Sequence, residues 1–206
     1  MHRLLALLLT VLLPCYVLAA PGDLDTSFGG GDGWVSTGSM GVSGANGQDV
    51  IQQADGKLVT AGYASNGRDD DFALARYNQD GSLDSSFDGD GKLTTQIGTS
   101  HDRANSVIQQ ADGKLLVVGY SSNKFVLVRY NSDGTLDASF NGTGKLTTVI
   151  GASDEAKSVI QQSDGKLVVA GYSYNASMGR QEVALARYST DGSLDTSFGT
   201  QGRVTA

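Results

Sequence analysis

The sequence has one cysteine and two prolines, and all three lie close to the N-terminus, at Cys15, Pro14 and Pro21. Beyond residue 21 the chain therefore has no thiol and no disulfide, so its stability must come from burial and hydrogen bonding. The 28 glycines, combined with so few prolines, indicate many tight turns rather than a proline-rich disordered chain.

Basic residues are also scarce, with 15 Lys and Arg against 22 Asp and Glu and a net charge of −7. Nucleic-acid binding calls for a basic surface, so the composition argues against a nucleic-acid partner. Histidine is rarer still, and His101 is predicted to be a solvated loop residue rather than a base or a ligand. No serine lies in a nucleophile-elbow pattern, and the paired carboxylates lie in turn sequences. We therefore expect no catalytic residue.

Long apolar runs are absent except at the start of the chain, where residues 4–13 follow Arg3. A basic start, a short apolar run and a small-residue exit predict a secretory signal peptide, cleaved after Ala19. The run is shorter than the ~20 residues that span a bilayer. The sequence thus predicts a signal peptide at 1–19 and one repeat domain at 20–206, in a secreted, periplasmic or cell-surface protein.

Cys15 offers an alternative, as the lipid-bearing cysteine of a lipoprotein signal. That pattern needs a small residue directly before the cysteine, where this chain has Pro14. A soluble exported protein is the favoured interpretation.

Internal repeats are the strongest signal in the chain. The word Val-Ile-Gln-Gln-x-Asp-Gly-Lys-Leu-Val/Leu recurs at 50–59, 107–116 and 159–168. A second word, Asp-Gly-Ser/Thr-Leu-Asp-x-Ser-Phe, recurs at 80–87, 133–140 and 191–198, with a degenerate copy at 22–28. These words predict repeats at about 29–87, 88–140 and 141–198, and a partial fourth repeat at 199–206.

Each repeat contains four short runs of β-type residues separated by turn residues, which in the middle repeat are 91–97, 104–110, 114–121 and 124–130. The second and third runs flank Asp112-Gly113, a strong hairpin signal because glycine accepts the positive φ of the turn. No apolar spacing of helical period extends beyond the N-terminal segment. The fold is predicted to be all-β.

The third run is apolar on both faces, as at 115–118 and 167–170, which predicts that each small sheet is covered on both sides. Radially stacked four-stranded sheets satisfy this requirement. We expect a β-propeller-like array of about three four-stranded antiparallel blades, plus the first strand of a fourth at 202–206. The fourth run, which ends in Arg-Tyr at 76–77, is predicted to be an outer strand whose arginine reaches the rim. A parallel β-solenoid is the alternative architecture.

The repeated words, together with Gly-x-Gly-Lys-Leu-Thr-Thr at 89–95, resemble the bacterial delta-sixty repeat, a β-propeller domain of unknown function. The resemblance covers nearly all of 22–206. It implies a propeller in an exported or cell-surface bacterial protein, and it implies no enzymatic activity and no catalytic residues.

Three blades are fewer than the four to eight of closed propellers, so both end sheets are expected to expose apolar faces. The chain is then a piece of a longer array, an open arc, or part of an oligomer. We favour an oligomer in which two chains form a six-blade ring, with 22–28 and 202–206 meeting at the seam.

A calcium site is the main candidate for metal binding. Asp80, Asp84, Asp88 and Asp90 place carboxylates around glycine turns, which suits a hard cation. The pattern lacks the closing glutamate of a calcium loop, and Asp88 and Asp90 become Asn141 and Thr143 in the next repeat. Turn capping is the simpler interpretation, so no metal or cofactor is firmly predicted. The acidic run at 69–71 is interpreted as a solvated loop.

Recognition is expected at the loops that vary between repeats, 64–71, 121–123 and 173–182. The last has the richest contact chemistry, from Tyr172, Tyr174, Met178 and Arg180. The repeated phenylalanines are interpreted as core residues rather than as a carbohydrate platform, and they are Phe28, Phe87, Phe140 and Phe198.

We therefore expect a secreted, non-catalytic binding or scaffold module whose partner is a protein or a glycan outside the membrane. Two alternatives remain: a polysaccharide hydrolase or lyase on a propeller scaffold, and a structural fragment of a larger surface repeat protein. An enzyme should carry a carboxylate or histidine cluster that breaks the repeat pattern, whereas only His101 and 69–71 do so.

Overall fold

The computed structural model describes residue 20 and residues 22–206. The predicted signal peptide therefore lies outside the described residues. In the described part, the chain forms twelve strands in three four-stranded antiparallel sheets and one short 3₁₀ turn, Gly29–Gly31.

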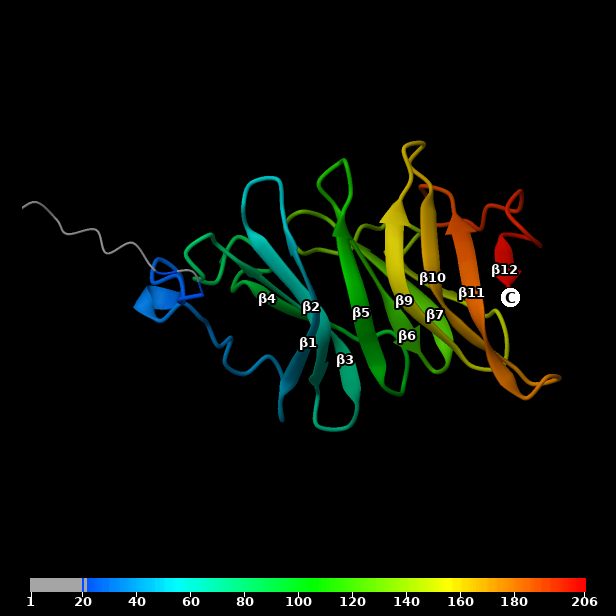
Figure 1. The fold of residues 1–206 in the computed structure, drawn as a ribbon, viewed down its shortest axis with the longest axis horizontal. Helices are drawn as coiled ribbons and strands as arrows, with labels where there is room; N and C mark the ends of the chain where they lie inside the picture. The colour runs from blue at the N-terminus through cyan, green and yellow to red at the C-terminus, as the bar shows by residue number, and fades with distance from the viewer. Residues whose placement is uncertain (1–19, 21) are drawn as a thin grey trace, which may run out of the picture.

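The three sheets follow one another along the chain and lie side by side (Figure 1). The first contains β1 (Ala45–Gln52), β2 (Leu58–Ser65), β3 (Asp70–Tyr77) and β4 (Lys92–Thr95). The second contains β5 (Asp102–Gln109), β6 (Leu115–Ser121), β7 (Lys124–Tyr130) and β8 (Lys145–Thr148). The third contains β9 (Asp154–Gln161), β10 (Leu167–Asn175), β11 (Arg180–Tyr188) and β12 (Arg203–Thr205). The prediction of an all-β, blade-like array is confirmed.

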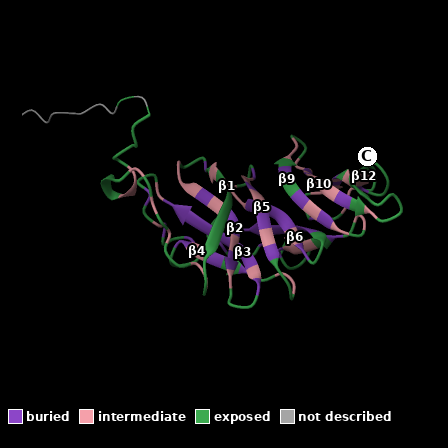
Figure 2. Cartoon of the chain, turned by 60° about the horizontal axis from the view of Figure 1, so that its bottom comes forward, coloured by how far each residue is buried: buried purple, intermediate pink, exposed green. Residues whose placement is uncertain are grey.

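Two hydrophobic cores lie between adjacent sheets. Strand β6 contributes to both, because Leu115 and Val117 belong to the core shared with the first sheet, and Leu116 and Val118 to the core shared with the third. Alternate residues of a strand point to opposite faces, so an unbroken apolar run supplies two cores at once. Figure 2 shows the consequence: the middle of the array is buried, whereas β1 at one end is largely exposed.

The phase of the repeat differs from the sequence prediction. Each sheet takes its outer strand from the segment after the Leu-Asp-x-Ser-Phe word, so the sheets span 45–95, 102–148 and 154–205. Residues 203–205 pair with β11 as the outer strand of the third sheet, and the prediction that they open a fourth blade is wrong.

The Arg-Tyr run is likewise not an outer strand. Strand β3 lies between β2 and β4, and Arg76 at its end is buried rather than exposed at the rim. The hydrogen-bonded ladder to β4 covers that side of the strand. Of the repeated phenylalanines, Phe87 and Phe140 are fully buried, which confirms the core interpretation for these two.

A glycine recurs in each second strand for a steric reason. A Cβ on Gly62, Gly119 or Gly171 would overlap a backbone oxygen of the neighbouring first strand. The ladder shifts register at the same place in each sheet, as expected for a β-bulge. Only glycine permits this close approach.

The loops gather at two edges of the array. One edge carries the three Asp-Gly turns, where Gly56, Gly113 and Gly165 adopt positive φ (Figure 1, upper side). The opposite edge carries the hairpin tips 66–69, 122–123 and 176–179 and the connections 96–101 and 149–153 (Figure 1, lower side). We call the latter the variable edge, because the predicted recognition loops lie there.

Candidate functional site

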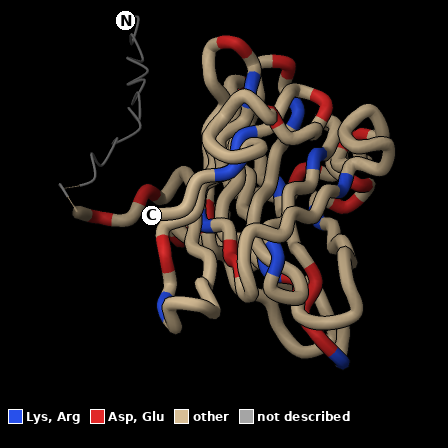
Figure 3. Tube along the Cα trace, turned by 90° about the vertical axis from the view of Figure 1, so that its right-hand side faces the viewer, with Lys and Arg blue, Asp and Glu red and all other residues tan. Residues whose placement is uncertain are grey.

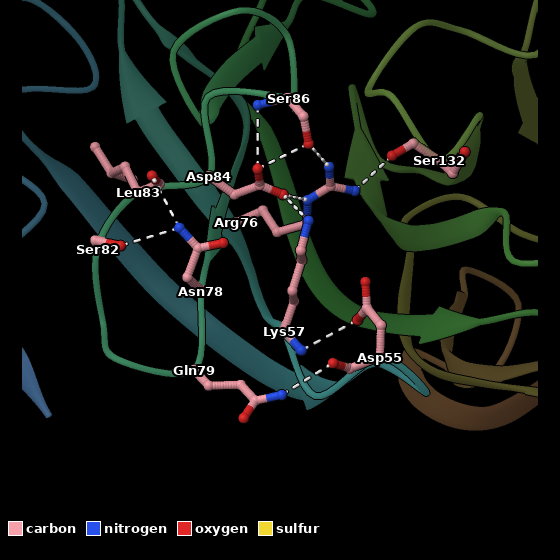
Figure 4. A network of polar contacts seen from close by, with 10 residues as sticks. All are labelled: Asp55, Lys57, Arg76, Asn78, Gln79, Ser82, Leu83, Asp84, Ser86 and Ser132. Carbon is pink, nitrogen blue, oxygen red and sulfur yellow. Dashed lines mark hydrogen bonds and ion pairs between the residues drawn. The ribbon is translucent and has the colours of Figure 1, made fainter. Parts of the chain in front are cut away.

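The most regular polar feature is a largely buried ion-pair network that recurs in each sheet; Figure 4 shows that of the first sheet. In the first sheet, Arg76 Nε lies 2.6 Å and Lys57 Nζ lies 2.7 Å from Oδ2 of Asp84. Ser86 donates its hydroxyl to the other carboxylate oxygen and accepts a bond from Arg76. The guanidinium also lies 4.6 Å from the centre of the Phe87 ring. Every polar atom of the carboxylate is thereby engaged.

The same network sets the protonation of the carboxylate. Burial alone would raise the pKa of Asp84, but hydrogen bonds from Lys57 and Ser86 and the charge of Arg76 lower that pKa well below its usual value. Asp84 is therefore a charged structural residue at neutral pH.

The same network recurs in the second and third sheets, and the arginines of the first and second sheets also bond the sheet that follows. Arg76 also donates to the backbone oxygen of Ser132 in the second sheet's turn, and Arg129 donates in the same way to Thr190 in the third. The equivalent ion pairs are Arg129 and Lys114 with Asp137, and Arg187 and Lys166 with Asp195. The polar residues common to all repeats are thus used inside the array.

The four calcium candidates have different local partners. Asp84 is engaged as described, and Asp80 accepts hydrogen bonds from the backbone N–H and hydroxyl of Ser82. Asp90 accepts from the N–H of Lys92, 2.9 Å away. Asp88 has a positive φ of 52°, and burial together with the charges of Asp90 and Asp133 raises its pKa.

Each of these contacts fits a turn. Asn141 shows the same positive φ at the position equivalent to Asp88, and Asn and Asp are the non-glycine residues that tolerate it best. Within residues 20 and 22–206, no group of three or more His, Cys, Asp or Glu side chains is placed to hold a metal ion.

Three of the predicted recognition residues lie at the exposed tip of the third hairpin. Met178 and the Arg180 side chain are 62% and 65% exposed, and Tyr174 is also exposed. Tyr172 lies deeper, where its hydroxyl bonds Glu155. The structure thus places Tyr174, Met178 and Arg180 on the variable edge and Tyr172 beside it.

A second group on the variable edge was not recognised in the sequence. Arg103 of β5 pairs with Asp70 of β3 at 2.6 Å and stacks 4.5 Å from the ring centre of Tyr63. His101 joins them, with Nδ1 accepting the backbone N–H of Asp70 at 3.2 Å. The His101 side chain is 57% exposed, in agreement with the predicted solvated loop residue, and it also contacts Asp70 of the neighbouring sheet.

A related group connects the second and third sheets. Asn105 donates to Glu155 at 3.1 Å, and Lys157 lies 5.7 Å from the ring centre of Tyr172 while it pairs with Glu155. The bond to Glu155 and burial raise the pKa of Tyr172 to about 12. Hydrogen bonds from Lys157, Tyr172 and Asn105 outweigh the effect of burial and lower the pKa of Glu155.

These two clusters occupy equivalent places. The cross-strand partners of the repeated tyrosines are Asn46, Arg103 and Glu155, opposite Tyr63, Tyr120 and Tyr172. The sequence did contain a signal for these clusters. The Gly-Tyr pair in the second strand of each sheet is constant, whereas the residue opposite the tyrosine on the first strand changes from repeat to repeat. This signal identifies a row of fixed aromatic residues whose facing residues, Asn46, Arg103 and Glu155, vary in charge.

Figure 3 shows the charged positions along the chain: the acidic ones lie mostly in loops and turns, whereas most of the basic ones lie in strands. Among the residues that the structure describes, no helix has the length and apolar character needed to cross a bilayer.

A search of curated proteins finds no match to the chain. A family model described as "Domain of unknown function (DUF5122) beta-propeller" matches residues 53–87, 110–140 and 162–198. Each matched segment begins beside an Asp-Gly turn and ends at the phenylalanine of the buried network, and together the segments cover half of the chain. With the three stacked four-stranded sheets, this match establishes that the chain belongs to the DUF5122 β-propeller family.

Proposed function

We propose that this protein is an exported, non-catalytic binding or scaffold module, which recognises a protein or a glycan outside the membrane through its variable edge. The observation that carries the proposal is the division of polar residues within each repeat. The residues common to all repeats pair inside the sheets, as Arg76 does with Asp84, whereas the residues that differ lie at one edge.

The chemistry of the variable edge supports recognition. The tip of the third hairpin offers an aromatic ring, a thioether and a guanidinium on Tyr174, Met178 and Arg180, which are residue types enriched in interfaces. Elsewhere along the variable edge, Arg103 and Glu155 are held in place by ion pairs and hydrogen bonds, so part of the surface is ordered before binding.

Export is part of the proposal. The signal-peptide pattern at 1–19 supports it, as does the resemblance of the repeats to the delta-sixty repeat of surface proteins. The one cysteine of the chain is Cys15, so the repeats contain no disulfide, and buried ion pairs help to hold each sheet instead.

The non-catalytic character is also proposed, and the arrangement around His101 supports it. Oδ2 of Asp70 lies 3.0 Å from Nδ1 of His101, but the same oxygen is paired with Arg103 at 2.6 Å, so this carboxylate holds an arginine as well as the imidazole. Nδ1 of His101 accepts a backbone N–H, a capping contact.

A binding screen tests the proposal. The purified protein is applied to a glycan array and used as bait for extracellular proteins, in parallel with a Tyr174→Ala/Met178→Ala variant. We expect a ligand whose affinity falls at least about tenfold in the variant, since both side chains would contact it. Ser163→Ala, an exposed change in the Asp-Gly turn on the other edge, is the matched control.

Two outcomes would contradict the proposal. One is a ligand whose affinity falls with the Ser163→Ala control as much as with the double variant. The other is turnover of a polysaccharide that His101→Ala abolishes, which would show an enzyme.

A further inference from the structure

The described chain contains one more outer-strand segment than it has sheets. We define an outer unit as a Leu-Asp-x-Ser-Phe turn and the short segment after it, which forms a strand in the last three units; the units are 24–37, 83–95, 136–148 and 194–206. The last three include β4, β8 and β12, the outer strands of the three sheets. The first, which we call the N-terminal outer unit, has no sheet of its own within residues 22–206.

The backbone of the N-terminal outer unit docks on the first sheet as an internal unit docks on the sheet that follows it. The N–H of Gly29 donates to the oxygen of Asp80 at 2.9 Å. At the equivalent internal position, the N–H of Asp88 donates to the oxygen of Asp133 at 2.8 Å. The two contacts differ only in the sheet that receives them.

Side-chain packing agrees. Phe28 and Val35 of the N-terminal outer unit lie against Gly81, where an added Cβ would approach both. The internal counterpart is the packing of Phe87 and Leu93 against Gly134. Glycine at this place in the receiving sheet leaves room for the phenylalanine of the arriving unit.

A hydroxyl pair completes each contact. Tyr130 donates to Oγ1 of Thr95 at 2.8 Å, and Tyr77 bonds Thr37 of the N-terminal outer unit in the same way. The N-terminal outer unit therefore makes the full set of contacts toward the sheet that follows it.

The N-terminal outer unit lacks the contacts that the other three outer units make with the sheet to which each belongs. The carboxylate of Asp25 accepts hydrogen bonds from Ser27, and among the described residues no cation pairs with it. At the equivalent position Asp84 is held by both Arg76 and Lys57. The turn is therefore formed, but its ion pair has no partner.

The third sheet shows the opposite deficit. Val183 of β11 is 61% exposed, whereas Phe72 and Phe125 at the equivalent place are fully buried against the next sheet. Ile160 is 58% exposed, although its equivalents Ile51 and Ile108 pack against cores. This face has the residues of an internal interface and no covering sheet within the described part of the chain.

We propose that the third sheet of one copy of this protein is covered by the first sheet of a second copy, whose N-terminal outer unit becomes the outer strand on β11. The sequence 24–28 is Leu-Asp-Thr-Ser-Phe, identical to 194–198. Asp25 of the second copy then pairs with Arg187 and Lys166, which hold Asp195 in the single chain. The N-terminal outer unit thus gains a sheet, and the exposed face of the third sheet gains a cover.

Two units compete for the edge of β11 at this seam, and one residue distinguishes them. The position four residues after the last glycine of the unit is Thr37, Thr95 or Thr148 in three units and Ala206 in 194–206. Alanine cannot accept a hydrogen bond from the tyrosine hydroxyl of the next sheet, so the N-terminal outer unit fits the seam better. It displaces the whole unit 194–206, including the ion pair of Asp195 and the strand at 203–205.

The contact joins two different surfaces, and it repeats from copy to copy until the array closes. Two copies contribute six sheets, a number within the range of closed propellers. This inference concerns assembly and is independent of the recognition proposed for the variable edge.

A charge reversal tests the ion pair. In the single chain Asp25 is exposed and contacts Ser27, so Asp25→Lys leaves the folded chain largely intact but sets a cation against Arg187 and Lys166 of the other copy. Asp32→Lys makes the same charge change at an exposed position of the same unit, whose equivalents Asp90, Thr143 and Gln201 are exposed and lie outside the buried ion-pair network. Light scattering on fractionated protein measures the mass, and circular dichroism confirms the fold.

We expect about twice the chain mass, or more, for the wild type and Asp32→Lys. For Asp25→Lys we expect the single-chain mass, with the dissociation constant raised about tenfold or more. A monomeric wild type at high concentration, or equal association of the two variants, would overturn the proposal.

A cross-link tests the register without loss of fold. Because Thr95 lies opposite Phe72 and Thr148 opposite Phe125, Thr37 of one copy should lie opposite Val183 of the other. Cysteines at such positions are close enough for a disulfide. A Thr37→Cys/Val183→Cys variant in a Cys15→Ser background should form covalent multimers on oxidation.

The matched control is Thr37→Cys/Met178→Cys, since Met178 is equally exposed on the third sheet but lies at the hairpin tip. Multimers of the first variant with monomers of the control support the seam. Equal yields, or no multimers from either, refute it.

Discussion

The buried hydroxyl of Tyr130 in the second sheet donates a hydrogen bond to Oγ1 of Thr95 in the first, 2.8 Å away, and Tyr188 repeats the bond with Thr148. Both bonds cross from one sheet to the next. They add polar contacts at the outer strand to those that Arg76 and Arg129 make from the central strands, and both sets connect one sheet to the next.

Removal of the acceptor should cost more than removal of the whole pair. Thr95→Val leaves the buried hydroxyl of Tyr130 without its acceptor and should lower the free energy of unfolding by about 1–3 kcal/mol. The double variant Thr95→Val/Tyr130→Phe removes both polar groups and should recover much of the loss. Urea denaturation measures both. A double variant less stable than Thr95→Val would refute this role of the bond.

The arginine of the buried network should matter most in the middle sheet. Arg129→Met leaves Asp137 buried with only Lys114 as a cation, and removal of one partner of a buried pair costs about 3–5 kcal/mol. Arg187→Met is the matched control, because the Arg187 side chain is 20% exposed against 7% for Arg129. Thermal unfolding should show the smaller loss for Arg187→Met, and equal losses would contradict an effect of burial.

Acid should weaken the array through the same carboxylates. The pKa of Asp137 is lowered in the folded state by hydrogen bonds from Ser139 and Lys114 and by the charge of Arg129, which together outweigh burial. The unfolded chain therefore binds the proton first, and the stability present above the usual pKa of 3.8 is lost as the pH falls below it.

The measurement is the urea midpoint at pH 7, 5 and 3. We expect little change between the first two values and a marked fall at the third. Asp137→Asn should be less stable at pH 7 and should show a shallower fall in acid, and an unchanged acid dependence would contradict the assignment.

The glycines opposite the β-bulges should not tolerate a side chain. A Cβ at Gly119 would overlap the backbone oxygen of Arg103, so Gly119→Ala should destabilise the fold by about 1–3 kcal/mol through overpacking. Gly47→Ala is the control, since a Cβ at this strand position meets nothing within 4 Å. Chemical denaturation should separate the two variants clearly, and an equal response would show that the bulge can open.

The sequence predicted the architecture well where local chemistry decides it. The Asp112-Gly113 turn and the apolar run of β6 are determined by φ and by burial on both faces, and both are visible in the residues. The phase of the repeat could not be obtained in this way. The word Gly-Lys-Leu-Thr-Thr has the same period whether it opens one sheet or closes the previous one, and only the ladder between β3 and β4 distinguishes the two.

The candidate site was harder to predict because its contacts join sheets. Arg76 follows an apolar run, which suggested a side chain at the rim. In the structure, the turn after β3 brings the carboxylate of Asp84 into contact with Arg76 and keeps the arginine buried. The joint recurrence of Lys57, Arg76, Asp84 and Ser86 in every repeat was the available signal. Arg103 and Asp70 pair in one place only, so no repetition marked them.

The placement of each outer strand has an evolutionary consequence. Every outer strand is encoded after the hairpin that it completes, and the loop behind it leads directly into the next sheet. A tandem duplication of one repeat length in the gene, cut at any phase, would therefore add one whole sheet with an intact ladder and an intact interface on each side. Recombination of this kind changes the length of the array by whole sheets.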